Sequence, residues 1–400
     1  MLLPVDVLAA IEGSEIESLL TRLVRERSDP GWPRQEEGVA RVLADYLRDG
    51  GLEPRFHEVA EGRPNLLCTL TGQGAGRRLL LCGHTDTVPL NSGDEGVGFS
   101  GVVENGRLLG RGAVDMKGAL AAMAVAMVAL HRGRAWAAGS LTLGAVIDEE
   151  MRSLGAEDLV RRGFQADGAV VGEPTDNRIC VGHKGLEWLE VRFQGRAAHG
   201  GTPRAGINAI VAAARFIRLL EEILGPRLRA RAHPVLGEPT IGVGTIRGGD
   251  QPSTVAATCV LTLDRRSVPG EDYASICAEL RELLSRVEGE MPGLVTTLDR
   301  MPGGMATLEH VGFATAADHP LVRSAQAACA SEGVTTELGA FPAWTDGGLL
   351  AGFAGIPSLV LGPGSLAVAH SPFEWVALSD VTRAARLYAR LALDFCAGTS

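Results

Sequence analysis

Apolar and polar residues follow two different patterns along the chain, and the N-terminal part shows the pattern of an α/β protein. Segments of helical periodicity and short, almost entirely apolar runs follow one another from residue 14 onward. The elements expected here are helices over 14–28, 34–50, 116–131 and 153–163, and strands over 55–60, 65–70, 78–84, 140–147 and 167–172. Strands that are apolar throughout indicate a mostly parallel sheet that helices cover on both faces.

The pattern changes near Val181. The stretch LEWLEVRFQG (186–195) alternates apolar and polar residues, as a half-exposed antiparallel strand does. The elements expected after it are a helix over 205–224, strands over 240–246 and 254–264, a helix over 271–287 and a strand over 294–300. This order predicts a small α+β, ferredoxin-like domain with one open sheet face.

After Pro302 the α/β pattern returns, with expected helices over 320–332, 347–354 and 378–396 and an expected strand over 357–362. We therefore expect a discontinuous large domain, residues 1–181 plus 301–400, interrupted by the small domain at 182–300. A length of 400 residues agrees with two domains, because a single core rarely grows that large.

Composition and charge narrow the classes of function. The net charge of −10 argues against a surface for nucleic acid or an anionic membrane. The seven cysteines are scattered without a CxxC motif, which indicates reduced thiols and a cytoplasmic protein. The N-terminus lacks the pattern of a signal peptide. The longest apolar run, residues 119–130, is too short to span a bilayer and predicts a buried helix.

Three consecutive carboxylates, Asp148, Glu149 and Glu150, follow an expected buried strand. Crowding like charges at such a position raises their pKa values and costs stability, so the arrangement indicates a functional requirement. In an extended segment Glu149 and Glu150 would point to opposite faces, and a bend after Ile147 is needed to bring both to one site. Nearby cations would offset the repulsion between them. The sequence assigns no role to Asp148.

Four further segments carry residue types that bind metals, each at a strand end or in a loop, where α/β enzymes place their sites. They are CGHTDTVP (82–89) with His84 and Asp86, GRGAVDMKG (110–118) with Asp115, VVGEPT (170–175) with Glu173, and GPGSLAVAHSPFEWV (362–376) with His370 and Glu374. Taken singly, each has a structural alternative, such as a core histidine or a helix-capping aspartate. Their spacing contains no short zinc motif such as HExxH and does not show that the segments converge.

These five segments, in this order, resemble the motifs of the two-zinc amidohydrolase and exopeptidase family. Its members include acetylornithine deacetylase, succinyl-diaminopimelate desuccinylase, aminoacylase and the glutamate carboxypeptidases. The resemblance extends from about residue 30 to the C-terminus. It implies the same interrupted two-domain layout, and a homodimer formed through the inserted domain.

The resemblance also implies a role for each matching residue. The implied metal ligands are His84, Asp115 and Glu173 for one ion, and Asp115, Glu150 and His370 for the other, with Asp115 bridging. Asp86 would orient a ligand, and Glu149 would be the general base that takes a proton from water and gives it to the departing amine. Histidine and carboxylate ligands without cysteine suit two Zn²⁺ ions per subunit, with Co²⁺ or Mn²⁺ as substitutes.

The inserted domain contains GRAAHGGTP (195–203), which resembles a family loop whose histidine reaches across a dimer interface. His199 would then stabilise the oxyanion at the neighbouring subunit's site, and the alternative is a surface-loop histidine. This chain has Gly200-Gly201 where the usual family form has serine after the histidine. A second departure is Ser253, which stands where the family commonly has an asparagine that contacts substrate.

Three more residues are candidates for substrate binding. Arg266, in LDRRSVPG, could bind a substrate carboxylate with its two-pronged guanidinium, or form an ordinary salt bridge with Asp264. Asp346 and Gly347, in AWTDGGLL, match a family loop that lines the pocket, and their alternative role is to begin a helix.

Together these motifs predict metal-dependent hydrolysis of the amide bond of an N-acyl amino acid or short peptide, most like the deacetylation of N-acetylornithine. Desuccinylase, aminoacylase, dipeptidase and carboxypeptidase activities of the same family are the alternatives. A further alternative is a catalytically inactive relative that acts as a binding protein. The presence of every metal-site position and of Glu149 argues against it.

Overall fold

The structure, a computed structural model, describes residues 4–91, 97–301 and 307–398. The chain forms two compact units, one from residues 1–182 and 314–400 and the other from residues 183–313. The second crossing therefore lies beyond residue 301, where we expected the chain to return. Residues just before it bond within the inserted unit: Leu186 N donates to His310 O (2.8 Å), and Tyr273 N donates to Glu309 Oε2 (3.0 Å).

The larger unit combines helices and mostly short strands. Its helices are α1 (Pro4–Ala9), α2 (Gly13–Arg25), α3 (Glu37–Asp49), α4 (Gly118–Arg132), α5 (Leu154–Arg161), α9 (Pro320–Ser331), α10 (Gly347–Gly352) and α11 (Leu378–Cys396), with the short helical turns η2 (Ala113–Lys117) and η5 (Leu366–Val368). Its strands, including two at the crossings, are β1 (Arg55–Ala60), β2 (Arg63–Thr71), β3 (Gly74–His84), β4 (Val102–Glu104), β5 (Arg107–Leu109), β6 (Ala138–Val146), β7 (Gly168–Val171), β8 (Ile179–His183), β13 (Phe313–Ala314), β14 (Leu338–Phe341), β15 (Ser358–Val360) and β16 (Trp375–Ala377). We did not expect β4, β5, β8, β13, β14 and β16, because strands this short carry little periodic signal.

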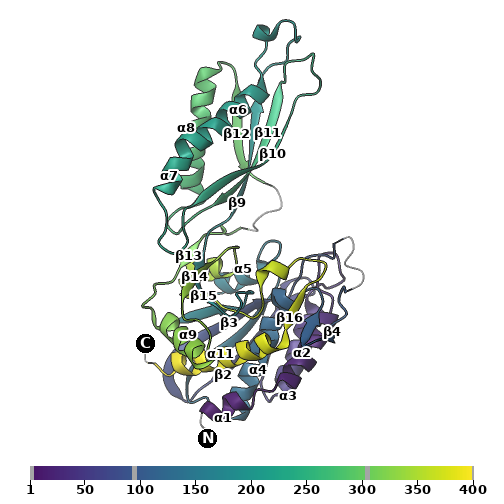
Figure 1. The fold of residues 1–400 in the computed structure, drawn as a ribbon, viewed down its shortest axis with the longest axis vertical. Helices are drawn as coiled ribbons and strands as arrows, with labels where there is room; N and C mark the ends of the chain where they lie inside the picture. The colour runs from purple at the N-terminus through teal and green to yellow at the C-terminus, as the bar shows by residue number, and fades with distance from the viewer. Residues whose placement is uncertain (1–3, 92–96, 302–306, 399–400) are drawn as a thin grey trace. The chain divides into compact units, whose positions relative to one another are not determined.

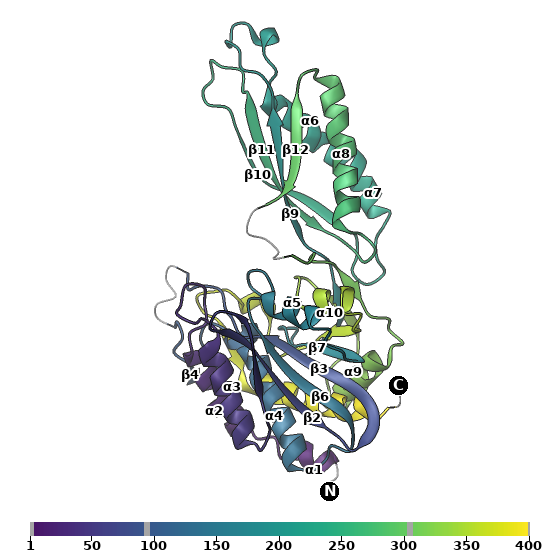
Figure 2. The ribbon, with the colours of Figure 1, turned by 180° about the vertical axis from the view of Figure 1, so that it is seen from behind.

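The central sheet of the larger unit is mixed. Within the described residues it has nine strands in the order β1-β2-β6-β3-β7-β15-β8-β13, with β14 paired to β8. The central strands β6, β3, β7 and β15 run parallel, and β2 and β8 flank them in antiparallel pairs. Figure 2 shows β2, β6 and β3 side by side. The sheet is therefore parallel at its centre and antiparallel toward its edges.

Helices cover both faces of this sheet. Leu79 and Leu81 of β3 belong to the core that includes α4, α9 and α11, whereas Leu80 and Cys82 pack with residues of α5 and α10 on the other face. Figure 1 shows α11 crossing the larger unit beside α9 and α4, to which it packs. Burial on both faces explains why these strands lack polar alternation. The predicted α/β fold class is confirmed.

The apolar helix α4 lies inside the larger unit. The helical stretch Ala113–Arg132 is longer than the 119–130 run read from the sequence. Among the described residues it is the one stretch that is long and apolar enough, by length and composition, to cross a membrane. Ninety-four per cent of its apolar window is buried inside the fold. Such complete burial is what the core helix of a globular domain shows, as expected from the sequence.

The inserted unit has the order strand, helix, strand, strand, helix, strand. Its elements are β9 (Glu187–Gln194), η3 (Pro203–Ala205), α6 (Ala209–Leu219), η4 (Leu220–Leu224), α7 (Gly225–Arg229), β10 (Thr240–Gly248), β11 (Thr258–Arg266), α8 (Tyr273–Glu290) and β12 (Val295–Arg300). The strands form an antiparallel sheet in the order β10-β11-β9-β12. This connectivity is that of a ferredoxin-like fold, as predicted.

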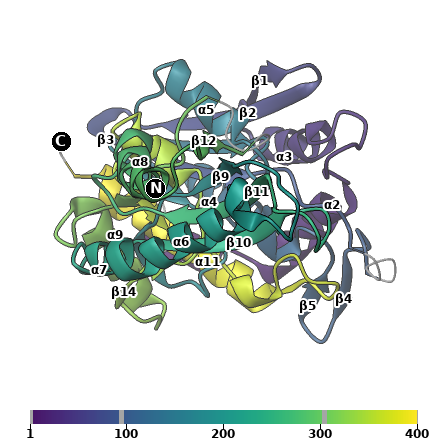
Figure 3. The same ribbon diagram turned by 90° about the horizontal axis from the view of Figure 1, so that it is seen from above.

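One face of this small sheet is covered and the other is open. Alternate residues Leu189, Val191 and Phe193 of β9 are buried against α6 and α8, while Trp188 on the opposite face is exposed. Helices α6 and α8 pack against each other, and Figure 3 shows the inserted unit that they belong to from above. Asp272 caps α8 by accepting from Ser275 N at 2.8 Å, which sets where that helix begins.

The parallel strands of the larger unit end along one edge of its sheet. Strand β3 ends at His84, β6 is followed by Ile147 and Asp148, and β7 is followed by Gly172 and Glu173. Because the carboxyl ends of parallel strands meet at one edge, side chains from these distant segments come together there.

Candidate metal centre and active site

Two histidines flank the carboxylate of Asp115. His84 is the last residue of β3, and its Nε2 lies 3.0 Å from Asp115 Oδ1. His370 lies in the loop after η5, and its Nε2 is 3.1 Å from Asp115 Oδ2. The two oxygens of one carboxylate thus face histidines from two distant segments, which is the arrangement that a bridging ligand requires.

A glutamate lies on each side of Asp115. Glu150 Oε1 is 3.1 Å from His370 Nε2, and Glu173 Oε1 is 3.7 Å from His84 Nε2. Ligand atoms of His84, Asp115 and Glu150 all lie within 4.8 Å of one another, and so do those of His84, Glu149 and Glu173. The structure therefore brings the five expected ligands into one cluster, with Glu149 beside them.

Burial and crowding shift the protonation of this cluster. Burial, and then repulsion from neighbouring carboxylates, raises the pKa values of Glu149 and Glu173 well above the ordinary value. Hydrogen bonds to Asp115 and Glu150 raise the pKa of His370 to about 10. Burial opposes ionisation of Asp115, but contacts with His370 and His84 outweigh it and lower the pKa of that carboxyl.

The residues present fit a pair of divalent cations. Glu173 Oε1 is buried and has no hydrogen-bond partner among the described residues, so it is left for a ligand to satisfy. Histidine nitrogens and carboxylate oxygens without cysteine form a donor set that suits Zn²⁺ and related divalent metals. Positive charge at this point would also offset the mutual repulsion of the carboxylates.

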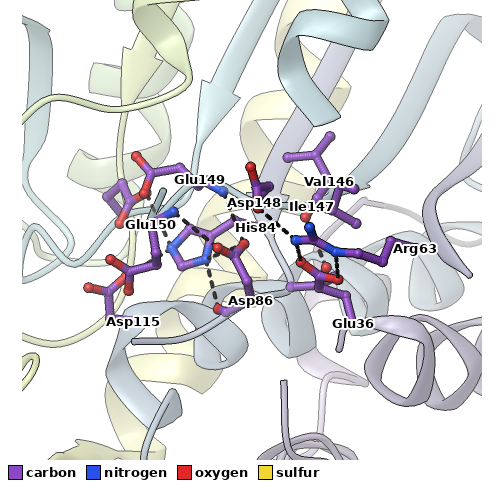
Figure 4. A network of polar contacts seen from close by, with 12 residues as sticks. Glu36, Arg63, His84, Asp86, Asp115, Val146, Ile147, Asp148, Glu149 and Glu150 are labelled. Carbon is purple, nitrogen blue, oxygen red and sulfur yellow. Dashed lines mark hydrogen bonds and ion pairs between the residues drawn. The ribbon is translucent and has the colours of Figure 1, made fainter. Parts of the chain in front are cut away.

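Asp86 holds the backbone of the turn that carries Glu149 and Glu150. Its Oδ1 accepts from Glu149 N at 3.1 Å and its Oδ2 from Glu150 N at 3.0 Å. His84 Nδ1 lies 3.0 Å from the backbone oxygen of Asp86, and the dashed lines in Figure 4 join Asp86 both to the histidine ring and to the turn. Asp86 is thus placed to orient the His84 ring and the two glutamates together.

The bend expected after Ile147 is present. Asp148 has a left-handed backbone with φ of 69°, which aspartate tolerates better than most residues. Its backbone oxygen accepts from the N–H groups of the next turn, those of Met151 (3.3 Å), Arg152 (3.0 Å) and Ser153 (2.6 Å). Because the chain turns here, adjacent glutamates reach the same site instead of opposite faces.

The model of peptidase family M20/M25/M40 matches residues 80–394, which contain every member of this cluster. The chain belongs to peptidase family M20. This agrees with the enzyme class predicted from the motifs and with the family resemblance on which that prediction rests.

Named relatives and solved structures agree with membership of the M20 family. The acetylornithine deacetylases of Aliivibrio salmonicida and Vibrio cholerae are 32% and 30% identical to this chain, over 92% and 95% of it and 94% and 97% of their own length. Aminopeptidase PepT from Bacillus cereus superposes with a TM-score of 0.78 at 21% identity, covering 96% of this chain and 99% of that one. Bacillus subtilis YXEP, described as a dinuclear metal binding peptidase from the M20 family, has a TM-score of 0.71 at 15% identity, with 96% and 98% covered. The last two similarities concern the fold.

Glu374 holds the segment that carries Asp115. Its Oε1 accepts from Val114 N at 3.1 Å and Asp115 N at 3.3 Å, and its Oε2 accepts from Arg111 Nη1 at 2.6 Å. The sequence placed Glu374 four residues after His370 but gave it no role. A buried carboxylate that accepts backbone N–H groups leaves no periodic signal, so sequence reasoning could not find this contact.

The GRAAHGGTP loop (195–203) lies in the inserted unit. His199 is exposed, and its Nδ1 accepts from Gly201 N at 3.0 Å. Gly200 N donates to Ser253 O at 2.7 Å, and a Cβ at Gly200 would lie only 2.9 Å from that oxygen. A side chain at position 200 would therefore force the Ser253 backbone to shift, which glycine avoids. The roles of His199 and Ser253 toward substrate stay predictions.

Arg266 is paired within its own unit. Its Nε donates to Asp264 Oδ1 at 2.7 Å and its Nη2 donates to Asp264 Oδ2 at 3.0 Å. The edge of the guanidinium that would bind a substrate carboxylate binds Asp264 in this structure. This salt bridge is the alternative role for Arg266 that the sequence suggested. A substrate role for Arg266 stays a prediction that requires this pair to open.

Asp346 and Gly347 lie at the start of α10 in the larger unit, and both are buried. Burial raises the pKa of Asp346 to about 7, and the nearby charge of His84 opposes this shift. Asp346 Oδ1 has no hydrogen-bond partner within the part of the chain that the structure describes. A buried carboxyl with a free oxygen near His84 suits a group that contacts substrate, and this role also stays a prediction.

Proposed function

We propose that this M20-family enzyme hydrolyses the amide bond of an N-acyl amino acid, with N-acetylornithine as the leading substrate. The observation that carries the proposal is the pairing of His84 and His370 on opposite oxygens of Asp115, with Glu149 beside them. Relatives named acetylornithine deacetylase that align over more than nine-tenths of the chain support this substrate class.

The metal ligands proposed are His84, Asp115 and Glu173 for one ion and Asp115, Glu150 and His370 for the other. We propose Zn²⁺ for both positions, with Co²⁺ or Mn²⁺ able to replace it. When bound, the two ions would polarise the scissile carbonyl and make a water molecule more acidic.

Glu149 is the general base in this proposal. Its carboxylate takes a proton from the attacking water and later delivers it to the amine nitrogen, which must be protonated to leave. Asp86 fixes the backbone N–H groups of Glu149 and Glu150, so the base and a ligand keep their relative positions. The adjacent glutamates thus have different roles, and the positive charge of the bound ions would offset the repulsion between them.

A substrate panel tests the proposal. The purified protein, loaded with Zn²⁺ or Co²⁺, is expected to release ornithine from N-acetylornithine faster than it hydrolyses any other substrate in the panel. The others are N-succinyl-diaminopimelate, other N-acyl amino acids, dipeptides and longer peptides from which a carboxypeptidase would remove the C-terminal residue. Release of free amine is measured, with Glu149→Gln protein prepared in parallel to report any contaminating hydrolase. Turnover of a succinylated substrate or a dipeptide with N-acetylornithine inert would replace the leading assignment by one of its alternatives.

We propose a cytoplasmic homodimer formed through the inserted unit. Strand β10 is one of the two edge strands of the small sheet, and its Val243 and Ile246 side chains are 38% and 50% exposed. Ile210 and Val211 on the neighbouring helix α6 are exposed as well. An uncovered apolar edge strand is a template for pairing with a second copy.

The cytoplasmic location is supported by the cysteines, which are all free thiols, as expected in a reducing compartment. They are Cys68, Cys82, Cys180, Cys259, Cys277, Cys329 and Cys396.

Mixing two inactive variants tests whether His199 completes the partner's site. Glu149→Gln and His199→Ala homodimers are each expected to be inactive or strongly impaired. After subunit exchange, half of the dimers would be mixed and each would contain one intact site, so roughly a quarter of wild-type activity should return. Exchange is followed with differently tagged subunits, and absence of recovery despite proven exchange would place His199 outside a shared site.

A further inference from the structure

Asp148, to which the sequence assigned no role, forms a hydrogen-bonded ion pair with an arginine of strand β2. Arg63, the first residue of β2, donates from Nη2 to Asp148 Oδ1 at 2.7 Å. The same guanidinium binds Glu36 with both prongs, from Nε to Oε2 at 2.8 Å and from Nη2 to Oε1. Figure 4 shows Arg63 and Glu36 on the side of the turn away from Asp115.

The three side chains form a buried group. The side chain of Glu36 is 0% exposed, that of Asp148 is 3% exposed and that of Arg63 is 16% exposed. A guanidinium held between two carboxylates in a fixed, forked geometry has little freedom to move. Asp148 is therefore tied to β2 and to the N-terminal end of α3, where Glu36 lies.

The same strand also holds the residue before Asp148. Asn65, two positions along β2 from Arg63 and so on the same face of the strand, accepts from Ile147 N at 3.1 Å with Oδ1. Its Nδ2 donates to Gly155 O at 2.9 Å. Strand β2 thus binds the turn on one side, through Asn65 and Arg63, while Asp86 binds the N–H groups of Glu149 and Glu150 on the other.

We propose that Arg63 is a positioning residue for the Glu149–Glu150 turn, acting through Asp148, with Glu36 as the carboxylate that fixes the arginine. The inference rests on the proposed function for its catalytic consequence, since Glu149 is the base there. The positioning of the turn does not depend on the proposed function: the Arg63–Asp148 contact fixes where the turn leaves β6. A shift of about 1 Å in a reacting group is enough to cost about 100-fold in rate.

Two conservative variants isolate this contact. Asp148→Asn keeps the shape of the side chain and adopts the left-handed backbone as readily as aspartate, so it removes only the carboxylate charge, which faces Arg63 at 2.7 Å and, more distantly, Arg152 at 3.7 Å. Arg63→Lys keeps the positive charge but replaces the fork by a single ammonium, which cannot bind Glu36 with two prongs and Asp148 together. Arg78→Lys, at the two-pronged surface pair with Asp167, is the matched control.

Each variant is expected to lower kcat about 10–100-fold at saturating Zn²⁺, with KM changed less than about twofold, and to weaken Zn²⁺ binding to the metal-free protein about tenfold. The double variant is expected to lose no more than the worse single one, because both act through one contact. Arg78→Lys should leave all three quantities unchanged. Calorimetric titration with Zn²⁺ supplies the readout that needs no substrate.

The outcomes separate this inference from the proposed function. If wild-type protein turns over no panel substrate while both variants still weaken Zn²⁺ binding, the positioning role stands and the proposed function fails. If wild-type protein is active and the variants keep its kcat per folded molecule and its Zn²⁺ affinity, the inference is overturned, even where the melting temperature falls. Losses that multiply in the double variant would equally overturn it.

Discussion

Replacing Glu149 by glutamine is expected to lower kcat by about 10²–10⁴-fold, the usual contribution of general acid–base catalysis. Glutamine has the same shape, but its amide cannot take up and release a proton at neutral pH. The bond from the residue 149 backbone N–H to Asp86 Oδ1, 3.1 Å in this structure, is independent of the side chain. The turn is therefore expected to keep its position, and so are the proposed metal ligands Glu150 and Glu173.

The measurement pairs turnover with metal content. Glu149→Gln should bind as much Zn²⁺ as the wild-type protein and show the loss entirely in kcat. Glu150→Gln, one residue away, should instead lose metal, because Glu150 Oε1 lies in the cluster 3.1 Å from His370 Nε2. Substantial turnover by metal-loaded Glu149→Gln protein would remove the general-base role from this residue.

The long elements and the site segments could be predicted because they carry periodic or compositional signals. The strand that ends at His84 and the strand before Glu173 are apolar throughout, and residues with metal-binding side chains follow them directly. Parallel pairing of β6, β3 and β7 then brings these strand ends to one edge. Strand pairing cannot be read from the local sequence, so only the family resemblance predicted that the metal-binding side chains would meet. The structure shows that they do, through the distances between them.

Contacts that depend on three-dimensional packing were beyond sequence reasoning. Nothing in the spacing of Glu36, Arg63 and Asp148 indicates that they form one buried ion-pair group, because they come from three separate segments of the chain. The return of the chain after Phe313 was misplaced for a similar reason. Residues 307–313 have no strand periodicity, and it is their contacts in the folded chain that place them with the inserted unit.

The second large effect is expected at Asp115. Replacing it by asparagine should weaken Zn²⁺ binding at both positions, each by more than about 100-fold. Residues that merely support metal ligands typically contribute about 10–100-fold, and a shared direct ligand should contribute more. Asp115 Oδ1 faces His84 Nε2 at 3.0 Å and Oδ2 faces His370 Nε2 at 3.1 Å, so asparagine leaves one of the two oxygens and no charge.

A comparison with a residue that is proposed to bind only one ion tests whether Asp115 bridges the two ions. Glu173→Gln should weaken one Zn²⁺ position and leave the other near its wild-type affinity, whereas Asp115→Asn should abolish both steps of a calorimetric titration. Asp45→Asn, a surface position paired with Arg48 on α3, provides the matched control for the loss of one carboxylate. Retention of one tight Zn²⁺ by Asp115→Asn protein would show that the carboxylate serves a single ion. In that case the two histidines on its opposite oxygens would belong to separate sites.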